Sequence, residues 1–100
     1  MEVTKRVDGS TAYLVVKGKL SVSTSPDLEA EISSLPEDVK NFDFDLSGLE
    51  YISSAGLRVL VSKQKIAIER GGTMVIHNPT DEVADIFDMT GLSDVFTIER

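Results

Sequence analysis

Two adjacent serines, Ser53 and Ser54, stand where a strand-like stretch gives way to helical periodicity, and Ala55 and Gly56 follow them directly. A serine at the start of a helix lies beside backbone N–H groups that have no partner within the helix. The helix dipole also favours negative charge at that end. Because the neighbouring side chains are small, we expect the hydroxyl to be accessible to another protein. The junction therefore suits an added phosphate.

The other polar residues offer less specific chemistry. Asp43 and Asp45 alternate with phenylalanines, but two carboxylates alone do not make a metal site. His77 is the only histidine, and a serine–histidine nucleophile pair would have to bring it against Ser53 or Ser54, without a G-x-S-x-G elbow. We therefore expect no metal, no cofactor and no enzymatic activity. A small hydrolase or nucleotide-binding enzyme that uses Ser54 with His77 is the alternative from another functional class.

Composition restricts the partners and the compartment. The net charge of −7 argues against binding to a nucleic-acid backbone, which requires clustered Lys and Arg. The absence of cysteine excludes disulfides and thiolate metal sites. Uninterrupted apolar runs are only a few residues long, against the ~20 that span a bilayer, and residues 1–6 do not resemble a signal peptide. We expect a cytoplasmic protein that contacts neither nucleic acid nor membrane.

The first part of the chain predicts a hairpin followed by a helix. Residues 3–7 and 11–17 have strand composition and flank an Asp-Gly-Ser turn, so they should pair in antiparallel orientation, with Gly18 ending the second strand. At Ser25-Pro26, the serine should cap a helix and the proline should occupy its first position. Pro36 should stop this helix.

The remainder alternates strands with helices. Strands are predicted at residues 39–46, 73–77 and 94–99, and helices at residues 57–70 and 78–91. The resulting order, β–β–α–β–α–β–α–β, is that of an α/β domain. We expect one small domain over residues 1–100, with a largely parallel sheet, an N-terminal antiparallel hairpin and helices packed on the sheet.

The helix at residues 57–70 carries two stripes that are rich in apolar residues. At 100° per residue, the broader stripe should pack on the sheet; it comprises Leu57, Leu60, Val61, Gln64 and Ile68. The narrower stripe begins beside Ser54 on roughly the opposite side; it comprises Ala55, Val59, Ser62 and Ile66. Three interpretations are open for the narrower stripe: a docking surface for a partner, a contact with another element of the same domain, or isolated exposed apolar residues.

Three motifs occur in order over nearly the whole chain. The central one is Asp45-Leu46-Ser47-Gly48 followed by Tyr51-Ile52-Ser53-Ser54-Ala55-Gly56-Leu57. The others are Gly18-Lys19-Leu20-Ser21 with Thr24-Ser25-Pro26, and Phe87-Asp88-Met89-Thr90-Gly91-Leu92. Together they resemble the signature of the STAS family, the bacterial anti-sigma-factor antagonists.

The resemblance implies a phosphorylation switch. In that family a serine kinase that is also the anti-sigma factor phosphorylates one serine at the strand-to-helix junction, which matches Ser54 here, with Ser53 as its rival. The unphosphorylated protein is implied to bind the anti-sigma factor and release the sigma factor; phosphorylation ends this binding and a serine phosphatase restores it. Members often carry aspartate where Ser53 and Ser21 stand in this chain. The implied partner-binding residues are Ser21, Thr24, Ser53, Ser54, Ala55, Gly56, Val59 and Ile66.

Two simpler interpretations accompany this one. Ser54 can act only as an N-cap, which stabilises a helix by ~1 kcal/mol and has no role in signalling. Alternatively, the chain is a STAS module that serves a transporter or a larger signalling assembly as a scaffold and is not phosphorylated.

Overall fold

The chain folds into six strands and three α-helices in a computed structural model that describes residues 1–100. The strands are β1 (Glu2–Asp8), β2 (Thr11–Leu20), β3 (Asn41–Asp45), β4 (Leu49–Ile52), β5 (Met74–His77) and β6 (Thr97–Glu99). The helices are α1 (Ser25–Ser33), α2 (Ser54–Glu69) and α3 (Asp81–Thr90), followed by the short 3-10 helix η1 (Leu92–Asp94). None of these helices has the length and apolar character needed to cross a membrane.

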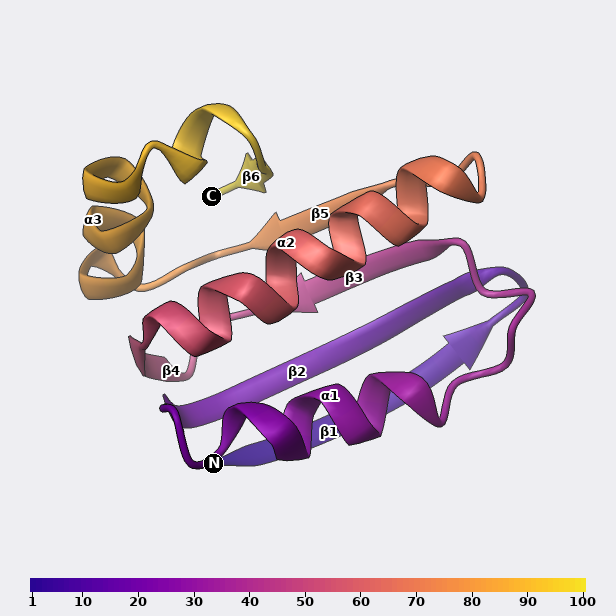
Figure 1. The fold of residues 1–100 in the computed structure, drawn as a ribbon, viewed down its shortest axis with the longest axis horizontal. Coiled ribbons are helices and arrows are strands. Elements are labelled where there is room, and N and C mark those ends of the chain that lie inside the picture. Colours follow the sequence, from indigo (N-terminus) through magenta and orange to yellow (C-terminus); the bar gives the residue numbers. More distant parts are fainter.

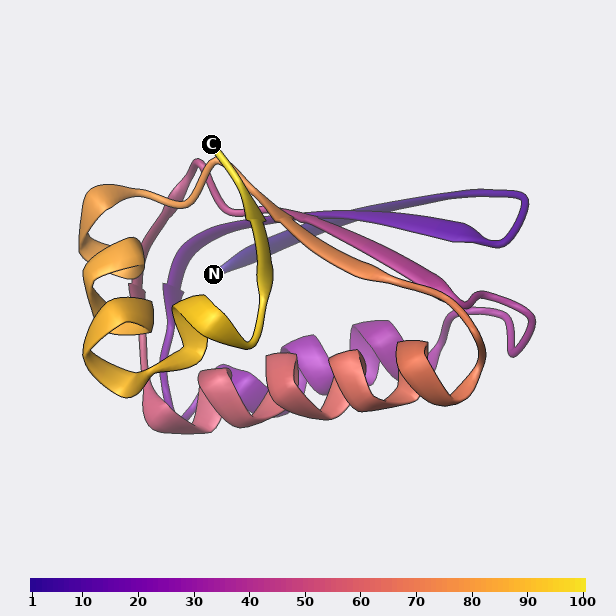
Figure 2. The same ribbon diagram turned by 90° about the horizontal axis from the view of Figure 1, so that it is seen from above.

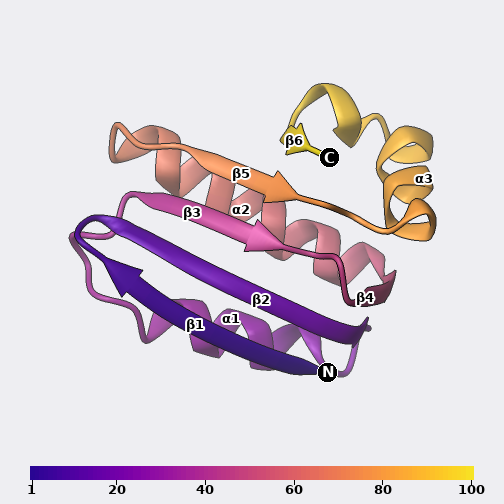
Figure 3. The same cartoon turned by 180° about the vertical axis from the view of Figure 1, so that it is seen from behind.

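The strands form one layer and two of the helices form a second. The sheet order is β1-β2-β3-β5-β6, in which only the β1–β2 pair is antiparallel. Helices α1 and α2 lie side by side on one face, and α3 lies at the end of the sheet beside β4 (Figure 1, Figure 2). The opposite face carries no helix, so a view from behind shows the strands in front (Figure 3). The predicted α/β class, with its parallel sheet and N-terminal hairpin, is confirmed.

The apolar core lies between the sheet and the two helices. Along residues 11–16 of β2 and along β3, buried residues alternate with half-buried ones, because successive side chains of a strand point to opposite faces. The strand side chains that face the helices are Ala12, Leu14, Val16, Phe42, Phe44, Met74 and Ile76. Leu28 and Ile32 of α1 complete this side of the core.

Strand β2 continues beyond the point where the sequence predicted its end. Gly18 has a φ of +91°, a conformation that glycine adopts readily, and the pairing register shifts between Gly18 and Lys19. The first half of β2 therefore pairs with β3, whereas its end pairs with β4. Strand β4 was not predicted, because its two outer residues are buried and its two inner ones exposed, without the alternation that marks a strand.

Helix α2 is rotated by about one residue, or roughly 100°, from the predicted orientation. Leu57 and Leu60 are buried as predicted, but Ile68 is 66% exposed and Ala67 is fully buried. The reason is Lys63, which is buried and whose Nζ lies 2.7 Å from Oε1 of Glu29 on α1. Because Lys63 is charged, apolar residues alone do not mark the side of α2 that is buried, and the predicted buried face was displaced from the observed one.

The same rotation changes the meaning of the narrower stripe. Val59 is only 9% exposed and belongs to the apolar core, so its interpretation as an exposed docking residue is wrong. Ile66 also packs partly against the core, and Ala55 is half-buried. Of this stripe only Ser62 is fully on the surface. Most of the stripe is therefore an internal contact of α2.

The burial of Val59 predicts a large loss of stability for Val59→Asp. An unpaired carboxylate at this position should lower the free energy of unfolding by about 4 kcal/mol, since it cannot be hydrated in the folded state. Ser62→Asp introduces the same charge on the exposed side of α2 and should change that free energy by no more than ~0.5 kcal/mol. Urea unfolding of both variants measures the difference. Equal unfolding midpoints would show that Val59 is accessible in solution.

Candidate functional site

The segment that leads from β3 to α2 begins with a tight turn. Oδ1 of Asp45 accepts a hydrogen bond from the Ser47 backbone N–H at 2.9 Å, and Leu49 N–H donates to the Leu46 carbonyl at 3.0 Å. Hydrogen bonds from Ser47 lower the pKa of Asp45 below its usual value. The backbone N–H of Ser47 has the larger effect and its side chain the smaller one. Asp45 is therefore a charged, structural residue that fixes the start of the segment.

The two serines at the junction have different roles. Ser53 is 6% exposed; its N–H donates to the Leu20 carbonyl at 2.8 Å, and its Oγ accepts a hydrogen bond from Gly56 N–H at 3.2 Å. Ser53 is thus the N-cap of α2, and its hydroxyl is occupied. Ser54 is the first residue of the helix, and its side chain is exposed. The structure assigns the capping role to Ser53 and leaves the Ser54 hydroxyl accessible.

Gly56 allows α2 to start directly against the strand ends. A Cβ at this position would lie 2.7 Å from Cγ of Leu20 and 2.9 Å from Cγ1 of Ile52, both closer than side chains tolerate. Because Leu20 ends β2 and Ile52 ends β4, the absent side chain lets the first turn of α2 touch both strands. Gly56 is buried and lies on the inner side of the first turn of α2, beneath the two serines.

The loop between β2 and α1 is the second part of this end of the molecule. Thr24 Oγ1 accepts a hydrogen bond from Ser21 N–H at 2.8 Å and donates to the Lys19 carbonyl at 2.9 Å, while Ser25 Oγ donates to the Ser21 carbonyl at 2.6 Å. The predicted N-cap role of Ser25 is wrong: it is the first residue of α1 and follows Thr24. These bonds hold the loop in place, with Val22 exposed at 70% on its tip.

The structure brings together most of the predicted partner-binding residues. The bond from Ser53 N–H to the Leu20 carbonyl places the loop next to the start of α2. The residues gathered at this end are Ser21, Thr24, Ser53, Ser54, Ala55 and Gly56. Val59 is buried, and Ile66 lies further along α2, so neither belongs to the group.

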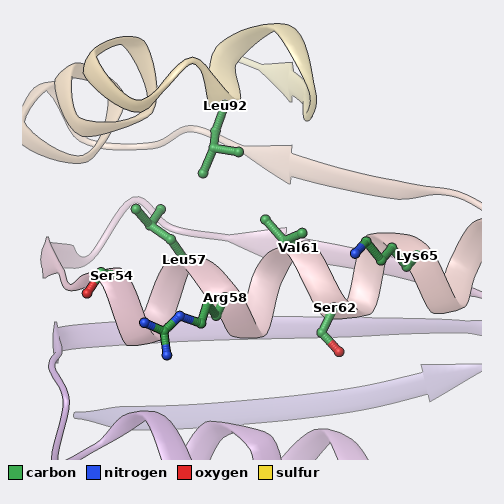
Figure 4. Close-up of a pocket in the computed structure, with 7 residues that line it drawn as sticks. All are labelled: Ser54, Leu57, Arg58, Val61, Ser62, Lys65 and Leu92. Carbon is green, nitrogen blue, oxygen red and sulfur yellow. The ribbon is translucent and has the colours of Figure 1, made fainter.

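A pocket of about 550 Å³ opens beside Ser54, between α2 and η1 (Figure 4). Its lining is partly apolar and partly cationic, without any acidic residue; it consists of Ser54, Leu57, Arg58, Val61, Ser62, Lys65 and Leu92. The apolar pattern of the helix does not indicate this pocket. A signal was present, because Arg58, Val61 and Lys65 follow Ser54 at helical spacing and so share its side of α2.

His77 lies away from this site, on the open face of the sheet. Its Nε2 is 3.5 Å from Oδ2 of Asp43 and its Nδ1 is 3.4 Å from Oε2 of Glu99. Ile76, the preceding residue, points into the core on the helix side, so His77 points to the other face. The sheet separates His77 from Ser54, and the predicted alternative of a serine–histidine pair is wrong.

The sequence profile of the STAS domain family matches residues 2–100. The chain belongs to the STAS family. This confirms the resemblance carried by the three motifs. The anti-sigma-B factor antagonist of Bacillus subtilis (strain 168) is 29% identical over 83 residues, which make up 83% of this chain and 76% of that protein.

Solved structures share the STAS fold. The anti-sigma factor antagonist SpoIIAA in its unphosphorylated form has a TM-score of 0.82 at 17% identity, covering 97% of this chain and 87% of its own. The phosphorylated form of SpoIIAA, from Bacillus, has a TM-score of 0.76 at 17% identity, with 97% and 90% covered. A sulfate transporter family protein from Wolinella succinogenes has a TM-score of 0.77 at 15% identity, with 95% and 80% covered.

The different roles of the two serines in this STAS domain can be separated by matched substitutions. Ser53→Ala removes the N-cap and should lower the free energy of unfolding by ~1 kcal/mol. Ser54→Ala removes an exposed hydroxyl without a structural hydrogen bond and should change it by less than ~0.5 kcal/mol. Urea unfolding of both variants against the wild type provides the measurement. A larger loss for Ser54→Ala than for Ser53→Ala would contradict the assignment of the cap.

Proposed function

We propose that this STAS protein is an anti-sigma-factor antagonist whose binding is switched off by phosphorylation of Ser54. The observation that carries the proposal is the exposed Ser54 hydroxyl at the first residue of α2, next to a serine whose own hydroxyl is occupied by capping. Relatives named as anti-sigma factor antagonists, in Bacillus subtilis and as SpoIIAA, support the same class of function.

The fold should accept a phosphate at Ser54 without rearrangement. The added charge would lie at the positive end of the α2 dipole, where negative groups are stabilising. Ser54 is exposed, so the phosphate remains hydrated in the free protein. SpoIIAA has been solved in both unphosphorylated and phosphorylated forms, and both share the fold of this chain.

The unphosphorylated surface around Ser54 suits a protein partner. It combines small polar residues of the loop and the α2 start with two exposed apolar side chains, Val22 and Tyr51. Tyr51 pairs with Lys19 in the β2–β4 register, so it borders the loop that carries Val22. The proposed partner is an anti-sigma factor that is also a serine kinase; a serine phosphatase would restore the bound state.

The proposed release is electrostatic and local. A phosphate carries about −1.5 to −2 charges at neutral pH. In a contact shaped for a small hydroxyl, the bound protein would offer this charge no compensating group, and removing its water costs several kcal/mol. A penalty of ~3 kcal/mol is already about a hundredfold in affinity. Phosphorylation therefore needs no conformational change to end binding.

Two substitutions at Ser54 should separate the bound from the released state. Ser54→Ala keeps the site small and should bind the anti-sigma factor about as tightly as the wild type, but it should not be released by kinase and ATP. Ser54→Asp adds one charge and should bind more weakly, by about tenfold or more, since ~1.4 kcal/mol corresponds to a factor of ten. Isothermal titration against the purified partner measures both. Equal affinity for Ser54→Asp and Ser54→Ala would rule out the electrostatic release.

Phosphopeptide mapping tests the acceptor itself. Incubation with the kinase-type partner and ATP should add one phosphate to the wild type and to Ser53→Ala, but none to Ser54→Ala. Modification of any serine outside the pair Ser53 and Ser54 would end the assignment. If the binding partner of this protein phosphorylates none of its residues, the protein would instead be an unphosphorylated STAS scaffold of a transporter or signalling assembly.

A further inference from the structure

A cationic side chain lies on the same side of α2 as Ser54. Arg58 follows Ser54 by one helical turn, and both residues line the pocket beside α2. The guanidinium of Arg58 extends back along the helix toward Ser54 (Figure 4). This direction is expected, because helical side chains lean toward the N-terminus of their helix and residues four apart are neighbours on its surface. The pair is therefore positioned by the helix itself.

Arg58 has no internal partner for its charge. The ion pairs of the structure use Lys5, Lys63 and His77 as the positive groups, and none uses Arg58. The pocket contains no acidic side chain, although the chain as a whole carries a net charge of −7. Arg58 is also exposed, so its guanidinium can change orientation at little cost. No acidic residue of α2 lies within four positions of Arg58, so an anion at Ser54 would be the nearest opposite charge to it along this helix.

We propose that Arg58 binds the phosphate on Ser54 within the same molecule. The inference rests on the proposed function, because it assumes that Ser54 is the phosphorylated residue. Guanidinium groups bind phosphate oxygens through two parallel charge-assisted hydrogen bonds. A negative residue four positions before a positive one is also the favoured order on a helix. Arg58 thereby holds the phosphate against α2, at the mouth of the pocket.

This pairing changes the surface that a partner meets. Before phosphorylation, Arg58 and Lys65 give the pocket two unpaired positive charges beside its apolar side chains. After phosphorylation, the charge of Arg58 is engaged by the phosphate, and the end of the pocket nearest Ser54 becomes neutral or negative. Phosphorylation therefore adds an anion to the surface and also neutralises the positive charge of Arg58 that a partner would otherwise meet. The two effects occur in one helical turn and leave the backbone in place.

The pairing can be measured without any kinase. Phosphoserine is incorporated directly at position 54 during translation, and its second ionisation is followed by phosphorus NMR as a function of pH. A nearby cation favours the dianion, so Arg58 should hold the pKa of the phosphoserine below the ordinary value of about 6. In Arg58→Gln that pKa should rise by about 0.5 relative to the wild-type background. Arg58→Lys keeps the charge but not the fork and should give an intermediate value.

Lys65→Gln is the matched control. It removes the same charge from the same pocket, but it lies ~16 Å from Ser54 along the helix, beyond the screening length of ~10 Å in 0.1 M salt. The pKa of the phosphoserine should therefore be unchanged in Lys65→Gln. An unchanged pKa in Arg58→Gln, or an equal rise in both variants, would overturn the inference.

The failure of this inference differs from the failure of the proposed function. If a kinase phosphorylates Ser54 but the phosphoserine has the same pKa with and without Arg58, the switch stands and the pairing is wrong. If the pairing is measured but no kinase-type partner modifies Ser54, the pairing stands and the proposed function is wrong.

Discussion

The close contact between the first turn of α2 and the ends of two strands is the constraint on which the site depends. Gly56 has no side chain, so the helix begins in contact with Leu20 at the end of β2 and Ile52 at the end of β4. The hydrogen bond from Ser53 N–H to the Leu20 carbonyl closes the same contact through the backbone. With the helix start fixed in this way, Ser53 must face inward, and Ser54, one residue later, must face solvent.

Much of the fold could be predicted from the sequence, because most of its elements follow simple patterns. Aromatic and β-branched residues mark β2, phenylalanines that alternate with aspartates mark β3, and the Asp-Gly-Ser turn marks the hairpin. Strand β4 could not be found, since its buried ends flank two exposed residues. The predicted orientation of α2 was wrong for a different reason. The buried Lys63 is paired with Glu29 of α1, and the sequence of α2 alone gives no sign of a pair with another helix.

The site was predictable to within one residue. The sequence places two serines before Gly56, and either can cap a helix that begins at the next position. Only the backbone geometry decides, because the extended conformation of Ser53, with φ −88° and ψ 170°, makes it the last residue outside the helix. The pocket was missed for a related reason, since its side of α2 lies about 100° from the narrower stripe, which was the predicted docking surface. Spacing relative to Ser54, rather than apolar character, identifies that side.

The parallel arrangement of the sheet has a consequence for how the chain folds. Only the pairing of β1 with β2 is local, whereas β2–β3, β3–β5 and β5–β6 each require a helix-containing connection to close first. Closing such connections costs chain entropy before the strand contacts compensate for it, which slows folding relative to helical bundles. The hairpin is therefore the pairing of this sheet whose closure costs the least chain entropy. At the other side of the sheet, β6 is only three residues long, and such a short edge strand offers little backbone for pairing with another chain.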